Sequence, residues 1–116
     1  MPGSPTMLTM SILDPSTPPL KPAELFVLAA LHAAPLHGYG LTQEVASRSQ
    51  GRIQIRPGNL YRVLDRLLER GLIEVHERAS AGDERRTYYR ITSLGRRVAQ
   101  AEAKLLAGVI GELLTT

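Results

Sequence analysis

The sequence lacks cysteine and tryptophan and has a single phenylalanine among its 116 residues. The lack of cysteine excludes disulfides, thiol redox chemistry and zinc sites built on thiolates. Because large aromatic side chains are scarce, the core has to be built from leucine, isoleucine, valine and alanine. A small aliphatic core of this kind is marginal on its own, so a homodimer that buries more apolar area would help to stabilise the fold.

Long apolar runs are absent as well, and none approaches the roughly 20 residues that a membrane-spanning helix needs. The first residues lack a basic segment followed by a continuous apolar stretch, so we expect no signal peptide. These absences lead us to expect a cytoplasmic protein with no membrane partner.

The residue types that build most catalytic and metal sites are scattered along the chain. His32, His37 and His76 fall on three separate predicted elements without a carboxylate cluster, so we expect no metal site. An enzyme needs converging groups, and no Ser-His-Asp order, glycine-rich phosphate loop or carboxylate pair stands out. We therefore expect no catalytic residues and no cofactor.

The charge that is present is carried mainly by arginine. The formal net charge is +3, and twelve of the fourteen basic residues are arginine. The planar guanidinium fork binds phosphates and guanine edges through two hydrogen bonds. A GC-rich genome also enriches arginine over lysine, so the composition is compatible with nucleic-acid binding but is weak evidence by itself.

The first 21 residues are rich in proline, serine and threonine, which is typical of a flexible arm. A small apolar island at Met7–Leu13 interrupts this arm. The island could dock on the body of the protein or mark an alternative start site, and the sequence does not distinguish the two.

Residues 22–34 predict a first helix that is apolar nearly all round, and we expect it to form the buried centre of the domain. Glu24 in its first turn suits the helix dipole. One face of this predicted helix carries Leu25, Leu28, Ala29 and His32. The next predicted elements are a turn at 36–40, a short helix at 41–49, and a short strand or extended loop at 51–56.

Pro57–Arg70 is predicted to be an amphipathic helix, because four leucines recur at helical spacing and arginines share another face. Such a helix could place Arg62 and Arg66 in a DNA major groove. The more common role of such a helix is to pack on the core with a solvated basic face. In that case Arg62 would pair with Asp65, and Arg66 with Glu69.

The elements after this helix complete a recognisable order. A strand at 73–78, a hairpin tip at 79–86 and a return strand at 87–91 precede Thr92, which is placed as the N-cap of a helix over Ser93–Leu114. We therefore predict a mainly α fold with a small β hairpin, a winged helix-turn-helix with a C-terminal dimerisation helix. The predicted parts are a flexible arm (1–21), a DNA-binding domain (22–91) and the dimerisation helix (92–116).

The final helix carries a continuous apolar stripe. Such a stripe is more often part of the intramolecular core than of an interface. Here, however, three helices and a sheet already close the predicted core, so the apolar surface near the end of the chain needs a partner. The residues predicted to form the dimer interface are Leu94, Val98, Ala101, Leu105, Leu106, Val109, Ile110 and Leu113.

Three stretches, HGYGLTQEV at 37–45, GNLYRVLDRLLERGLIE at 58–74 and RRTYYRITSLGRR at 85–97, resemble the PadR family of transcriptional regulators. The family pattern has a Gly-Tyr turn, a G-T-L-Y-P-x-L-x-R-L recognition helix and a wing that ends in R-x-Y-Y-x-I-T-x-x-G. The resemblance covers about Leu25 to Gly95. Asn59 stands where the family often has threonine, and Arg62 where it often has proline. The short C-terminal part resembles the small subfamily, whose last helix builds the dimer.

The resemblance implies a DNA-binding regulator, and we expect a homodimeric repressor that binds a pseudo-palindromic operator in double-stranded DNA. A small-molecule effector would release it by favouring one spacing of the recognition helices. Tyr39 could equally pack the start of the second helix, and Asn59 could simply brace its turn. The residues predicted to contact DNA are Tyr39, Asn59, Tyr61, Arg62, Arg66, Arg85 and Arg86.

Two other hypotheses remain open at this point. The winged helix could be a protein-interaction module that binds an acidic partner through its arginine face without DNA. It could also be a winged helix of MarR or ArsR type. The short C-terminal helix and the TYYRIT segment at 87–92 argue against that family.

Overall fold

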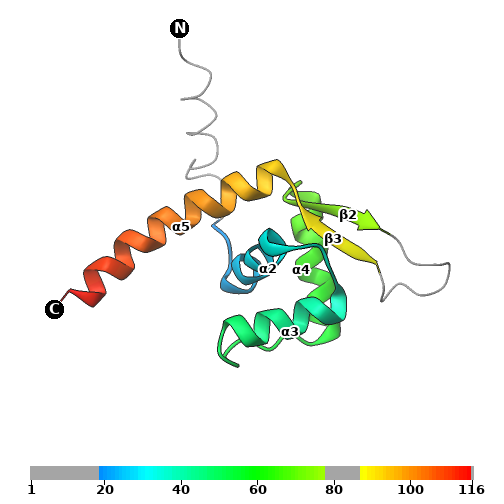
Figure 1. Ribbon diagram of the computed structural model, residues 1–116, viewed down its shortest axis with the longest axis horizontal. Coiled ribbons are helices and arrows are strands. Elements are labelled where there is room, and N and C mark those ends of the chain that lie inside the picture. The colour runs from blue at the N-terminus through cyan, green and yellow to red at the C-terminus, as the bar shows by residue number, and fades with distance from the viewer. Residues whose placement is uncertain (1–18, 78–86, 116) are drawn as a thin grey trace, which may run out of the picture.

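Four helices and a three-stranded antiparallel sheet make up residues 19–77 and 87–115, the parts of the chain that the computed structural model describes (Figure 1). The sheet has the strand order β1-β3-β2. This mainly helical winged-helix architecture confirms the predicted fold class. In chain order the elements are α2 (Pro22–Ala33), β1 (Leu36–His37), α3 (Gly38–Arg48), α4 (Pro57–Glu69), β2 (Ile73–Glu77), β3 (Tyr88–Ile91) and α5 (Ser93–Leu114).

Helix α2 lies at the centre of the core, as its apolar composition predicts. Its residues Val27, Leu28 and Leu31 are fully buried among side chains from α3, α4, β3 and α5. The predicted buried face is wrong in part, because Ala29 and His32 are exposed. This side of α2 is left open because α5 covers it only in part. Leu20, which the sequence placed in the arm, is buried in the same core.

The segment 36–40 is not the turn that its glycines suggested. Leu36 and His37 form strand β1, which pairs with Tyr89 and Tyr88 of β3, and helix α3 begins at Gly38 rather than at residue 41. The His37 Nδ1 atom accepts a hydrogen bond from the Gly40 N–H at 3.1 Å and so caps the helix. A histidine cap is an uncommon helix signal, which is why the pattern did not predict it.

Helix α4 begins at Pro57, as its sequence predicts, and ends at Glu69, one residue before the predicted end. Pro57 is at its first position, Arg70 is its C-cap, and Gly71 follows with φ of +73°, a conformation that glycine adopts readily. The apolar side of the helix is buried against the core. Its buried residues are Leu60, Val63, Leu64 and Leu67. Residues 53–56, left open between strand and loop, have no regular structure.

Strand β3 leads directly into the long helix α5, whose bounds match the prediction. Thr92 caps α5 and ties it to the turn after α4, since its Oγ1 accepts from the Gly95 N–H at 2.9 Å and donates to the Gly71 carbonyl at 2.7 Å. The predicted hairpin tip at 79–86 lies outside the described residues. No helix in the described ranges has both the length and the apolar character needed to cross a bilayer.

Candidate nucleic-acid interface

Helices α3 and α4 pack against each other and are joined by residues 49–56 (Figure 1). Gln50 and Gly51 turn the chain between them with positive φ angles of 56° and 80°. The Ile53 N–H donates to the Ser49 hydroxyl at 2.9 Å and holds the start of the connection. This helix-turn-helix presents the outer side of α4 to solvent next to the first turn of α3.

The outer side of α4 carries the two residues that depart from the family pattern. Asn59 and Arg62 are both exposed, Asn59 in the first turn and Arg62 one turn later. Within residues 19–77 and 87–115 no salt bridge joins Arg62 to Asp65. The helical pairing that would have occupied this guanidinium is therefore not formed, and Arg62 is exposed on the outer side of α4.

The contact that Arg66 makes was not among those the sequence predicts, which were DNA contact or an ion pair with Glu69. Its Nε lies 3.0 Å from Oε2 of Glu24 on α2, and not beside Glu69. The Glu24 side chain is 2% exposed, and that of Arg66 is 45% exposed. The ion pair directs the Arg66 Nε toward the body of the domain.

The two tyrosines lie at the junction of α3 and α4. Tyr39 is 67% exposed in the first turn of α3, and its hydroxyl accepts a hydrogen bond from the Gln43 side chain at 3.1 Å. A Cβ added at Gly38 would lie 3.8 Å from the Tyr61 hydroxyl, so that hydroxyl is at the start of α3. Tyr39 does not pack into the core, and the Tyr61 hydroxyl lies at the N-terminus of α3, where Tyr39 occupies the first turn.

The electrostatic environment of this surface is positive. Neither α3 nor α4 has an acidic side chain in its first turn, so the partial positive charge of each helix N-terminus is not neutralised there. Arg52 and Arg56 are exposed in the connection that leads into α4. Such an arrangement favours phosphate groups. Arg85 and Arg86, predicted to extend the surface along the wing, lie outside the described residues.

The residues predicted for dimerisation fall into two groups. Leu94 and Val98 pack against the core of their own chain, and Ala101 is half-buried. The others stand on the part of α5 that extends beyond the body of the domain (Figure 1). The large apolar side chains exposed there are Leu105, Leu106, Val109, Ile110, Leu113 and Leu114; Leu114 is an addition to the predicted set.

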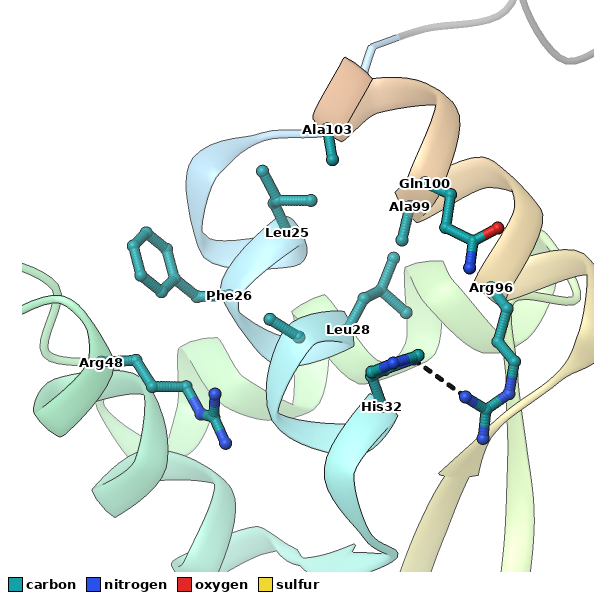
Figure 2. A pocket seen from close by; sticks show the side chains of 10 residues that line it. Leu25, Phe26, Leu28, His32, Arg48, Arg96, Ala99, Gln100 and Ala103 are labelled. Atoms are coloured by element: carbon teal, nitrogen blue, oxygen red, sulfur yellow. Dashed lines mark hydrogen bonds between the residues drawn. The ribbon is translucent and has the colours of Figure 1, made fainter. Parts of the chain in front are cut away.

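A groove lies between α2 and α5 and was not predicted. Its volume is about 490 Å³, and Figure 2 shows Leu25 and Leu28 of α2 facing Ala99 and Ala103 of α5 across it. Arg96 bridges the two helices, with its Nη1 2.8 Å from His32 Nδ1 (Figure 2). Because a guanidinium only donates, the Nδ1 atom of His32 acts as the acceptor.

The described residues contain no group of three histidine, aspartate or glutamate side chains able to hold a metal ion. Besides the groove, the described residues offer a positive surface on α3 and α4 and an apolar surface on α5. The first suits a polyanion, and the second suits an apolar protein surface.

Comparison with known proteins identifies the fold. The family model described as the transcriptional regulator PadR-like family matches residues 27–101. A transcriptional regulator from Clostridium thermocellum is 25% identical with a TM-score of 0.63, covering 80% of this chain and 90% of that one. A PadR-like transcriptional regulator from Bacillus cereus is 23% identical with a TM-score of 0.61, over 80% and 91% of the two chains; at this identity it shows the fold alone.

An uncharacterized protein of Lysinibacillus sphaericus is 38% identical over 60 residues, which are 52% of this chain and 55% of that protein. The chain thus spans about half the length of the curated relative it matches. Proteins of the matched family are transcriptional regulators rather than enzymes; they bind DNA and typically dimerise. Since the family model covers more than half of the chain, from α2 into α5, the protein belongs to the PadR-like family of transcriptional regulators.

Proposed function

We propose that the protein is a homodimeric repressor that binds a pseudo-palindromic operator through α4. The observation that carries this proposal is the exposed side of α4, where Asn59 is exposed and Arg62 forms no helical ion pair, beside two unneutralised helix N-termini. In a helix-turn-helix the N-terminal residues of the second helix reach base edges. Two such helices in one dimer would enter successive major grooves about 10 bp apart.

The polar side chains around α4 divide into two roles. Asn59 can pair through two hydrogen bonds with adenine and Arg62 with guanine, so these two would set sequence preference. The exposed hydroxyl of Tyr39 and that of Tyr61 at the start of α3 would contact phosphates and fix the register. On the wing, Arg85 and Arg86 would follow the flanking minor groove.

The homodimer is supported by the apolar surface on α5. At about 100° per residue, Leu105, Val109 and Leu113 form one line along the helix. Leu106, Ile110 and Leu114 form a second, adjacent line. The two lines together form an apolar stripe wider than a single seam, so more than one partner helix is needed to cover it. A second copy of the chain offers two helices, its own α5 and the α2 that lies across the groove from it.

Repression and release follow from the same dimer. A protein that covers a promoter blocks polymerase by occupancy alone, so the simplest regulatory outcome is repression. The groove between α2 and α5 has a volume within the range of ligand sites. We place an effector there, at the dimer interface, where a ligand that prefers one packing of the partner helix would change the distance between the two recognition helices.

A salt series tests DNA binding directly. Binding of the full chain to random duplex DNA should weaken steeply with ionic strength, because log K falls by about 0.9 per phosphate contact for each unit of log salt. Fluorescence anisotropy from low to physiological salt measures the slope. Absence of binding at low salt would overturn the regulator hypothesis and favour a protein-interaction module.

Replacing Arg62 by alanine tests sequence reading. If Arg62 pairs with a guanine, Arg62→Ala should cost about 1–3 kcal/mol on the operator and relax the preference at one base position. Lys104→Ala, which removes one positive charge from exposed α5, is the charge-matched control and should leave that preference intact. The measurement is in vitro selection of bound sequences. An equal loss on every sequence would assign Arg62 to a phosphate instead.

A further inference from the structure

The carboxylate of Glu24 is the most buried charged group in the described residues, at 2% exposure. Both of its oxygens are used. Oε1 accepts the Lys21 backbone N–H at 2.8 Å, which closes the first turn of α2, and Oε2 lies 3.0 Å from the Nε of Arg66 on α4. One side chain therefore joins the start of the central helix to the recognition helix.

This contact differs in kind from the rest of the packing between α4 and the core. Leucine and valine side chains hold α4 by burial, which is non-directional and tolerates small rotations of a helix about its own axis. An ion pair between Nε and a carboxylate oxygen is short and directional. Because the Glu24 carboxylate is itself held by the α2 backbone, it provides a fixed point for α4.

We propose that Arg66 is a positioning residue for DNA binding. Through Glu24 it sets the rotation of α4, and thereby the direction in which Asn59 and Arg62 leave the helix, and it does not read a base itself. The proposal rests on the proposed function, and it reassigns a residue that the sequence places among the DNA contacts. If Arg66 moved away from Glu24, the buried carboxylate would be left without a partner. Because a buried, unpaired charge is costly, the paired geometry is strongly favoured.

The two roles for Arg66 predict opposite effects of a change at Glu24. If Arg66 reads DNA, Glu24→Gln releases its guanidinium and removes a negative charge, so binding is unchanged or tighter. If Arg66 positions α4, Glu24→Gln loosens the helix and weakens specific binding even though the protein becomes more positive. The sign of the change separates the two roles.

The experiment measures affinity for a selected operator and for random duplex DNA across a salt series. It compares the natural full chain with Glu24→Gln, Arg66→Gln and the double variant. We expect each single variant to weaken operator binding by about fivefold or more, the loss of at least one base contact. Random duplex binding should keep its salt slope, since no phosphate contact is lost. The double variant should bind the operator no more weakly than the weaker-binding single variant, because both changes remove the same contact between Glu24 and Arg66.

Glu44→Gln is the matched control. It removes a carboxylate from an ion pair with Arg48 on α3 that is exposed on both sides, so it measures the general electrostatic effect of losing one negative charge. Thermal unfolding by circular dichroism identifies a temperature at which every variant is folded. If Glu24→Gln is not folded at any useful temperature, Glu24→Asp keeps the charge and shortens the reach by one methylene; it should weaken operator binding in the same direction.

Three results would overturn the proposal. These are unchanged or tighter operator binding by Glu24→Gln relative to Glu44→Gln, additive losses in the double variant, or a salt slope that falls by about 0.9 in Arg66→Gln. If the natural chain binds neither the selected operator nor random duplex DNA at low salt, the proposed function is overturned, and this inference is overturned with it.

Discussion

Replacing Gly95 by alanine is expected to lower the free energy of unfolding by about 3 kcal/mol or more. Gly95 is buried in the first turn of α5, and a Cβ there would overlap the backbone carbonyl of Leu72 and come within 2.8 Å of Ile91 Cγ1. The Leu72 carbonyl cannot move away freely, because it accepts the Thr92 N–H at 3.0 Å. The added methyl group therefore has to separate α5 from the turn after α4.

Guanidinium denaturation at one fixed protein concentration measures this loss, since the stability of a dimer depends on concentration. Gly108→Ala is the matched control in the same helix. A Cβ at Gly108 has nothing within 4 Å in the described residues, and alanine is the better helix former by roughly 1 kcal/mol. If the free energy of unfolding of Gly95→Ala lies within about 1 kcal/mol of that of the natural chain, α5 does not approach Leu72 as closely as the structure has it.

The boundaries of the longer helices could be predicted because each carries its own local signals. Pro57 and Gly71 mark the two ends of α4, and the Thr92 hydroxyl caps α5. These are contacts within one or two turns, so the residue types alone report them. Strand β1 has no such signal, since its pairing partner Tyr89 lies far along the chain.

The candidate site was less predictable, because its geometry depends on contacts between elements. Glu24 fitted the helix dipole in its sequence context, but only the packing of α2 on α4 pairs it with Arg66. The sequence puts His32 on one face with Leu25 and Leu28 of a helix expected to be buried, whereas His32 lies at the groove and contacts Arg96. An acidic residue in an otherwise apolar helix is the signal that could have indicated a partner, because a buried carboxylate needs one.

Placing two aspartates in the first apolar line of α5 is expected to separate the proposed dimer and to abolish tight binding to the proposed operator. Leu105 and Val109 are more than half exposed in the single chain, so Leu105→Asp with Val109→Asp leaves the core of each domain intact. In the dimer the same positions would bury carboxylates without partners, which is strongly unfavourable. Sedimentation or light scattering should report monomers where the natural chain gives dimers.

The loss of the dimer should carry over to DNA. A monomer engages one half-site, and without the second domain held nearby its operator affinity should fall by about 100-fold or more. Gly108→Asp with Gly111→Asp adds the same two charges on the side of the helix that faces away from the centre of the two apolar lines, at about 100° per residue, where a Cβ meets nothing within 4 Å in the described residues. That control should remain dimeric. A Leu105→Asp and Val109→Asp variant that stays dimeric places the interface elsewhere, and one that is monomeric but binds the operator as before shows that a single α4 suffices.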